Sequence, residues 1–359
     1  MQALAQTICF TAAALFAALI VPLSLSGVAG LPAVLAAYAP PVGHARELLG
    51  GYALAVVTGY LIGRPSAAQL VLVCASWLTA RAAWLLDPGG SWATLTQALF
   101  ALVFAASLAP KFVGSGRRWR NLAIAPLLAL LAAASVALDG SFGHAPAARE
   151  AMLLLLAALL AFMGGRLLAP AVATHLERAG FTPAARVQPR LEGAVLVLLA
   201  LAVALSAAHA PRPLAGTCTL AAGAVVLTRL ARWQVWRCRR RIDLVCLALG
   251  HLWLGLGLLL FGVGLTTGNT TSAGIHLITV GGLGTFSFNV MLRARLQRLR
   301  RDPAGDRLVP LGTLLLAVAT VARGAATTVA GEPATLLMAL AAAAWSLAFV
   351  ALARRLVRR

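Results

Sequence analysis

The sequence predicts an all-α fold, a polytopic bundle of about twelve transmembrane helices that forms one membrane domain over residues 1–359, with both termini in the cytoplasm. Apolar residues make up 61% of the chain and charged residues only 11%, whereas soluble domains carry about 25% charged residues. Apolar runs of about 20 residues recur along the chain, which is the length of a helix that crosses a bilayer. Basic residues gather in alternate connections between these runs.

The predicted spans are the apolar runs between charged or Pro/Gly-rich breaks. All should be helices, because a backbone in lipid has to satisfy its own hydrogen bonds and the alternating pattern of a membrane barrel is absent. The first run has no preceding Lys or Arg and is long, which favours a retained span over a signal peptide. The first six spans and the last six show no convincing repeat. The spans are 7–27, 46–63, 68–86, 92–110, 121–138, 150–169, 191–209, 213–231, 242–266, 271–292, 309–330 and 334–353.

The distribution of basic residues predicts the orientation of the bundle. Twenty-five Lys and Arg residues lie in the connections after even-numbered spans and in the C-terminal tail, against three in the opposite loops. Because cytoplasmic loops carry the excess of basic residues, these connections and both termini should be cytoplasmic. The net charge of +20 therefore indicates a lipid bilayer as the partner and not nucleic acid, which requires basic residues on one folded face.

Two histidines, His251 and His276, fall inside the ninth and tenth predicted spans. Ionisable groups in a membrane are costly and often functional, and a neutral imidazole in an apolar bundle is a good ligand for copper or haem iron. The alternative is that each histidine bonds a neighbouring helix, and the sequence leaves both interpretations open. A third histidine, His44, opens the second span and shares a helix face with Glu47.

Arginines and glycines complete the list of candidate site residues. We expect Arg81 to extend toward Asp87 at the outer surface, with a cofactor carboxylate as the alternative partner. The glycines after His276 would let another helix or a flat cofactor approach closely. The five cysteines show no CxxC spacing and should pack as small hydrophobes. No nucleotide-binding loop, Ser-His-Asp arrangement or zinc-protease helix is found, which argues against hydrolytic chemistry.

Four segments together resemble the NnrS family, polytopic membrane proteins associated with haem, copper and the bacterial response to nitric oxide. The family opens its second span with a His-x-His-Glu-Met-x-x-Gly-Phe segment and later carries Gly-Gly-Arg, Leu-His-Leu-Gly-Tyr-x-Trp and His-x-x-Thr-Val-Gly-x-x-Gly-Thr segments. The similar segments here occur in the same order over most of the chain. They are 44–52, 164–166, 247–253 and 276–285.

The sequence also departs from the family pattern. Arg46 stands in place of the second histidine of the first motif, and Ala248 in place of the histidine of the ninth span. His251, where the family has Tyr, lies one helical turn from Ala248 and shares its face. A Pro-Asn-Trp-Thr-Gly stretch and a histidine after the tenth span are also missing. These departures imply a divergent member whose metal binding is altered or lost.

The resemblance implies a protein of the bacterial inner (cytoplasmic) membrane that binds haem, copper or both and protects against nitric oxide or nitrosative stress. We expect the metal ligands to be His44, His251 and His276, between the second, ninth and tenth spans toward the outer face. Arg46, Glu47 and Arg81 would contact the cofactor or orient a ligand. The sequence assigns no catalytic residue, leaves open whether the protein is an enzyme, and gives no oligomeric state.

Two other functions remain open. A secondary transporter would have a substrate pathway through the bundle lined by Arg81, Gln97, Asn289 and Arg323. A structural subunit without catalytic activity would present a large apolar face to a partner.

Overall fold

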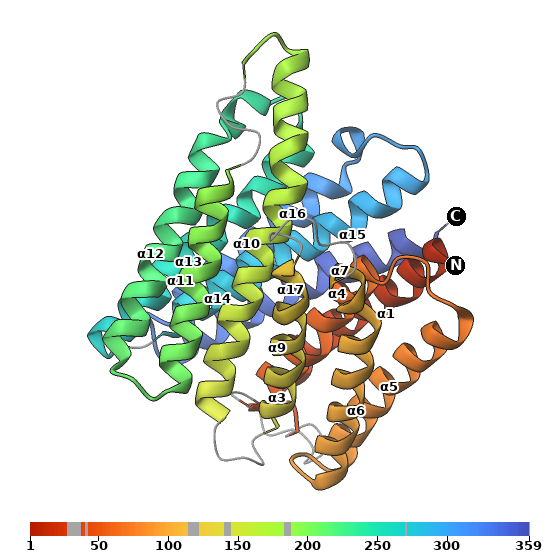
Figure 1. Cartoon of the computed structure of the whole chain (residues 1–359), viewed down its shortest axis with the longest axis vertical. Coiled ribbons are helices and arrows are strands. Elements are labelled where there is room, and N and C mark those ends of the chain that lie inside the picture. Colours follow the sequence, from red (N-terminus) through yellow and green to blue (C-terminus); the bar gives the residue numbers. More distant parts are fainter. Residues whose placement is uncertain are drawn as a thin grey trace. The chain divides into compact units, whose positions relative to one another are not determined.

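The regular elements of the computed structural model are all helices in the part of the chain that it describes, which is residues 1–26, 37–39, 42–113, 122–139, 145–182, 188–269 and 271–358 (Figure 1). Ten helices in these ranges are long and apolar enough to cross a membrane. The predictions of an all-α fold and of a multi-pass membrane protein are therefore confirmed. The exact number of spans and the side on which the termini lie stay predictions.

Most predicted spans correspond to single helices, and most of these have similar bounds. Large apolar side chains such as Leu72, Leu78 and Leu102 remain exposed on these helices, as expected of surfaces that face lipid. The helices are α1 (Gln2–Ser26), α5 (Ala67–Leu86), α6 (Ser91–Leu108), α10 (Ala145–Arg178), α11 (Pro189–Ala207), α12 (Arg212–Arg232), α13 (Ile242–Thr267), α16 (Leu308–Ala325) and α17 (Glu332–Val357).

The predicted second and tenth spans are each built from three consecutive helical segments. The second consists of α3 (Val42–Ala45), η1 (Arg46–Ala53) and α4 (Leu54–Leu61). The tenth consists of α14 (Ser272–His276), η3 (Leu277–Gly284) and α15 (Thr285–Arg298). Both η1 and η3 are π-helices of eight residues, with two glycines at the fifth and sixth positions. Because π-helical segments are rare and frequent at functional sites, these two helices are the first places to look for a site.

Two spans differ from their predicted bounds. The predicted fifth span corresponds to α9 (Ile124–Ala137), which at 14 residues is shorter than the others. The sixth was predicted to end at residue 169, before a connection that begins at Pro170, but α10 continues through Pro170 to Arg178. Proline was taken as a helix breaker, yet membrane helices tolerate it where neighbouring groups satisfy the freed carbonyl. About half of the longest predicted loop is therefore helix.

The helices gather into two compact units. Unit 1 contains Met1–Met152 and Phe349–Arg359, and unit 2 contains Leu153–Ala348, so the boundaries fall within α10 and α17. Within unit 1, α1 packs along η1 and α4, and α5 packs against α6. Within unit 2, α12 packs along α13, and α13 packs along α14, η3 and α15. Whether the chain functions as a single membrane domain stays a prediction.

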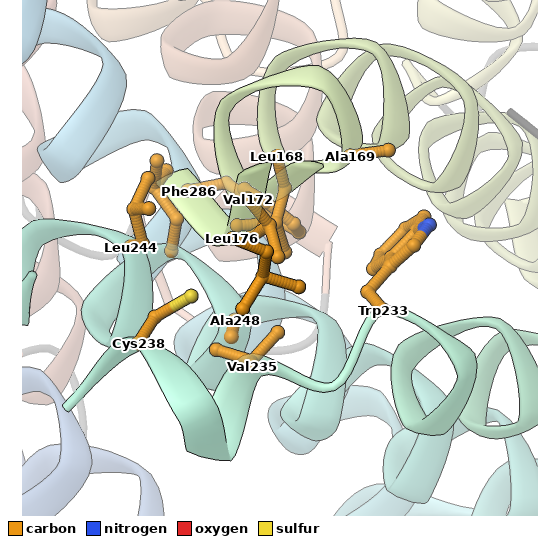
Figure 2. Close-up of a cluster of buried hydrophobic side chains, with 11 residues drawn as sticks. Leu168, Ala169, Val172, Leu176, Trp233, Val235, Cys238, Leu244, Ala248 and Phe286 are labelled. Carbon is orange, nitrogen blue, oxygen red and sulfur yellow. The ribbon is translucent and has the colours of Figure 1, made fainter. Parts of the chain in front are cut away.

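A hydrophobic cluster anchors one end of unit 2. Figure 2 shows side chains of α10 meeting those of the connection between α12 and α13, together with Phe286 of α15. Trp233 and Phe286 are 2% and 3% exposed, and both also contact His251. The cluster therefore fixes the walls around that histidine. Its buried members are Leu168, Ala169, Val172, Leu176, Trp233, Val235, Cys238, Leu244, Leu247, Ala248 and Phe286.

Part of the basic charge of unit 2 holds its connections together. Asp243, at the start of α13, accepts hydrogen bonds from Arg241 at 3.0 Å and from Arg293 of α15 at 2.6 Å. The hydrogen bonds to Asp243 raise the pKa of Arg241 above its usual value. The pair ties the start of α13 to α15 on the predicted cytoplasmic side.

Candidate functional site

The main polar site of unit 1 is centred on Arg46, the first residue of η1. Its side chain is completely buried, and its guanidinium donates to Asp139, which follows α9, and to the adjacent Glu47. The guanidinium also lies 4.2 Å from the ring centroid of Trp84, a distance at which a cation is attracted to the face of the ring. Arg46 thus joins η1 to α5 and to the end of α9.

Arg81 of α5 extends the same network inward. Its Nη1 donates to Oε2 of Glu47 at 2.9 Å, and its Nη2 donates to the side-chain oxygen of Gln97 on α6. Gln97 in turn donates to Ser135 of α9 at 3.1 Å. Arg81 is only 6% exposed, so the expectation that it extends toward Asp87 at the surface is wrong. Its partners are instead the buried Glu47 carboxylate and the buried Gln97 amide.

The charges of this network balance within the described residues. Two guanidinium groups, from Arg46 and Arg81, face two carboxylates, from Glu47 and Asp139. Burying two ion pairs is costly unless their remaining hydrogen bonds are also satisfied, which Gln97 helps to provide. The arrangement therefore has a sufficient structural explanation, namely that it fixes η1 against α5, α6 and α9. The roles predicted for Arg46, Glu47 and Arg81 at a cofactor stay predictions.

The glycines of η1 make room for this network. A Cβ on Gly51 would lie 2.6 Å from Nη1 of Arg81, closer than real Cβ atoms come to other atoms. The Gly51 carbonyl also accepts a hydrogen bond of 3.0 Å from the Trp77 indole. A larger residue at this position would press on the guanidinium where it reaches Glu47. His44 lies half-buried in α3, two residues before this π-helix.

The candidate ligand with the best-defined orientation is His276 in unit 2. It is the last residue of α14, directly before η3, and its side chain is half-buried. Its Nδ1 lies 2.7 Å from the Ser272 carbonyl oxygen. A carbonyl can only accept, so Nδ1 carries the proton and, in the neutral ring, Nε2 carries the lone pair. Histidine ligands of metals are commonly held in this way.

His251 of α13 has very different surroundings. It is completely buried between the rings of Trp233 and Phe286, with centroid separations of 5.0 and 4.7 Å. Neither ring nitrogen makes a hydrogen bond of good geometry with the described residues, although the Ala161 carbonyl lies nearby. A Cβ on Gly164 would lie 2.8 Å from Cε1 of His251, which shows how closely α10 approaches. This is a closely packed imidazole, not one that faces an open site.

His251 and His276 lie at different levels of the same helix pair. Gly250 of α13 is next to Phe286, whereas Gly257 is next to Ile278. By this antiparallel register, His276 is level with the residues just after Gly257, about eight residues or ~12 Å along α13 from His251. The structure does not bring these two imidazoles to one point within unit 2. His44 belongs to unit 1, and a centre that it shares with either of them stays a prediction.

The glycines of η3 are packed against helices. A Cβ on Gly281 would lie 2.6 Å from Trp253 of α13, and one on Gly284 would lie 2.6 Å from Trp345 of α17. Of the two partners that the sequence allowed for these glycines, the structure shows neighbouring helices. A flat cofactor at His276 would therefore have to lie away from this glycine face.

The described residues contain no group of three or more His, Cys, Asp or Glu side chains placed to hold a metal ion. This does not argue against a haem, which needs as few as one protein ligand.

Sequence reasoning missed part of the unit 1 network. Asp139 lies just after the predicted span 121–138 and Ser135 within it, and neither was a candidate, yet both are buried against η1 or α6. The missing signal was charge balance, because two intramembrane arginines need two acids and Glu47 supplies only one. Gln97 and Asn289, expected to line a transport pathway, form interhelical hydrogen bonds, the latter with Thr313 at 3.0 Å. These bonds neither require nor exclude such a pathway.

Comparison with known proteins gives a single clear result. A family model described as NnrS protein matches residues 4–358, nearly the whole chain. The sequence matches no curated protein.

Proposed function

Because the chain belongs to the NnrS family, we propose that it is a protein of the bacterial inner (cytoplasmic) membrane that binds haem, copper or both and protects against nitric oxide or nitrosative stress. Haem iron or copper would supply a centre able to bind nitric oxide. The contribution of this chain is to hold the metal by an oriented imidazole inside an apolar bundle.

The observation that carries the proposal is the hydrogen bond between Nδ1 of His276 and the Ser272 carbonyl. It fixes the tautomer and the ring orientation, so that the Nε2 lone pair has a defined direction. The ring follows α14 and precedes a π-helix, a backbone form that recurs at functional sites. His276 is therefore the first ligand in the proposal.

The surroundings of the other two histidines support weaker roles. His251 is enclosed by Trp233, Phe286 and Gly164, and ligation there requires at least one of these neighbours to move. His44 lies beside η1 and its charge network, where Arg46 and Glu47 already bind each other. We propose both as ligands secondary to His276.

The test is metal and haem analysis of the detergent-purified protein from cells supplied with both metals. We expect haem or stoichiometric copper in the wild type and a loss of at least tenfold in His276→Ala. The matched control is His175→Ala, because His175 is also half-buried in unit 2 but lies near the end of α10. Ser272→Ala should keep the metal, because the bond to Ser272 uses the backbone carbonyl.

Two results would overturn the proposal. One is wild-type protein free of both metals after such supplementation. The other is equal metal content in the wild type and in His276→Ala, with both proteins monodisperse.

A strain that produces the protein should also survive nitric oxide better than one that produces His276→Ala at the same level.

A further inference from the structure

The connection between α12 and α13 contains a short 3₁₀-helix, η2 (Val235–Cys238), whose sides differ in character. The backbone N–H of Arg237 donates to the Gln234 carbonyl at 3.0 Å, which is the three-residue spacing of this helix type. Residues three apart share a face in a 3₁₀-helix, so Val235 and Cys238 lie on the same side. Both belong to the hydrophobic cluster of Figure 2, at 7% and 0% exposed. One side of η2 therefore fixes the connection to unit 2.

The remaining sides of this connection are exposed and carry an aromatic ring and three arginines. Trp236 is 59% exposed, and the arginine triplet, Arg237, Arg239 and Arg240, is exposed as well. By the same three-residue spacing, Arg239 follows Trp236 on one side and Arg240 follows Arg237 on the other. The burial of the first side thus turns one indole and three guanidinium groups away from the core together.

The end of α10 orients one member of the triplet. Gly180, at φ +79°, ends this helix, and the N–H of Phe181 donates to the Leu176 carbonyl at 2.9 Å, which is the pattern of a glycine cap. Phe181 is 44% exposed, and the Arg237 guanidinium lies 4.9 Å from its ring centroid. Attraction to a ring face uses no hydrogen bond, so the N–H groups of this guanidinium stay available for the oxygen atoms of a ligand.

The acidic groups near this connection leave the triplet's charge uncompensated. Asp243 pairs with Arg241 at 3.0 Å, and Asp302 lies 3.4 Å from the same guanidinium. Glu177, in the last turn of α10, is followed by Arg178, so this helix end adds no net charge. The ion pairs among the described residues include none with the arginine triplet. Three positive charges therefore face outward beside two exposed aromatic rings.

We propose that the arginine triplet, with Trp236 and Phe181, binds the headgroup phosphate of an anionic phospholipid. Arginine binds phosphate through two parallel hydrogen bonds, and an exposed tryptophan at the end of a membrane helix lies at the level of the headgroups. Basic residues between membrane helices on the cytoplasmic side, where the sequence predicts this connection to lie, are typical of sites for anionic headgroups. Charge and ring placement together fit a lipid that lies against the ends of α10 and α12.

The neighbouring connection between α15 and α16 provides a matched control. It also carries three exposed arginines, Arg300, Arg301 and Arg307, but Asp302 and Asp306 lie between them. It has no exposed tryptophan. Removing its three arginines changes the net charge of unit 2 by the same amount as removing the triplet, so the comparison separates a specific site from general attraction between charges.

The test is lipid binding to the purified, delipidated full chain in detergent, followed by native mass spectrometry. We expect the wild type to bind phosphatidylglycerol at least tenfold more tightly than phosphatidylcholine. Arg237→Gln/Arg239→Gln/Arg240→Gln should lose at least tenfold in affinity for phosphatidylglycerol, whereas Arg300→Gln/Arg301→Gln/Arg307→Gln should change it less than twofold. Arg237→Lys keeps the charge but loses the paired hydrogen bonds, and should still weaken binding by at least threefold.

A second measurement needs no variant. Phosphatidylglycerol with a photoreactive headgroup should label the segment around Trp236 in the wild type and leave residues 300–307 unlabelled. The site uses neither His276 nor a metal, so His276→Ala should bind the lipid as the wild type does.

Several results would overturn this inference. They are equal binding of the two lipids by the wild type, equal losses in the two triple variants, and an Arg237→Lys variant that binds as the wild type does. Displacement of the lipid by millimolar inorganic phosphate would also overturn it, because it would identify a site for the free anion.

Discussion

The two π-helices, η1 in unit 1 and η3 in unit 2, have the same length and both carry glycines at the fifth and sixth positions, but their surroundings are opposite. In η1 the glycine pair admits a guanidinium, since Gly51 lies against Arg81. In η3 the corresponding region admits indole rings, since Gly281 lies against Trp253 and Gly284 against Trp345. A glycine-containing π-helix therefore lets a guanidinium approach its backbone in one unit and indole rings approach it in the other.

The difference teaches that a glycine pair after a histidine does not by itself identify a cofactor site. In both helices the space that the missing Cβ atoms leave is filled by side chains of neighbouring helices. What separates the two is polarity. The charges of the η1 network pair with one another, whereas the imidazole of His276 beside η3 is oriented by a backbone carbonyl.

The largest expected effect is the loss of one charge from the η1 network. Glu47→Gln leaves two buried guanidiniums facing one carboxylate, so we expect the free energy of unfolding to fall by roughly 3–5 kcal/mol. SDS titration of the reconstituted protein, followed by tryptophan fluorescence, measures it. The control is Asp87→Asn, an exposed carboxylate in the same unit that should change stability by less than about 0.5 kcal/mol. Equal effects of the two would show that the network contributes little.

The next prediction concerns the ion pair between Glu47 and Arg81 and its contribution to stability. If their 2.9 Å ion pair stabilises the fold, the double variant Glu47→Gln/Arg81→Gln should lose less stability than the two single variants lose in total, by roughly 1–3 kcal/mol. A double-mutant cycle in the same SDS titration gives the value. Strict additivity would mean that each side chain acts through other partners.

Changing a glycine tests the packing of η3. Gly284→Ala places a Cβ 2.6 Å from the Trp345 ring, and overpacking of this kind costs about 1–3 kcal/mol. Gly324→Ala on α16 is the control, because the added Cβ would lie 3.7 Å from the Leu277 side chain, an ordinary contact, and alanine is the better helix former. The control should be neutral or more stable. Unchanged stability of Gly284→Ala would indicate that the Trp345 side chain moves aside at little cost.

The smallest effect is expected at His251. Its ring nitrogens gain little from the described surroundings, so His251→Leu should change stability by less than about 1 kcal/mol, in contrast to Glu47→Gln. Metal and haem analysis of the same purified variant tests its proposed role as a ligand. A stable variant with normal metal content would remove His251 from the proposed ligands, whereas loss of metal would support it as a ligand.

The helices could be predicted from the sequence, whereas the side-chain pairs between them could not. Apolar runs and basic loops predicted an all-α membrane protein because bilayer thickness and hydrogen bonding allow few alternatives. Side-chain pairing depends on which helices are neighbours, and no run of residues reveals that. Arg81 was therefore assigned to the nearby Asp87, although Glu47, 34 residues away in sequence, is its partner.

The internal charge balance of unit 1 has a consequence for how the protein is made. The segment Val42–Leu61 carries Arg46 and Glu47 in its first two turns, and an unpaired charged side chain in an inserting helix is costly, up to about 2.5–3.5 kcal/mol for an arginine at the helix centre. Its compensating groups, Arg81 and Asp139, leave the ribosome later. This span should therefore integrate poorly alone and be retained in the bilayer only when α5, α6 and α9 have followed, which makes biogenesis of this half a concerted step.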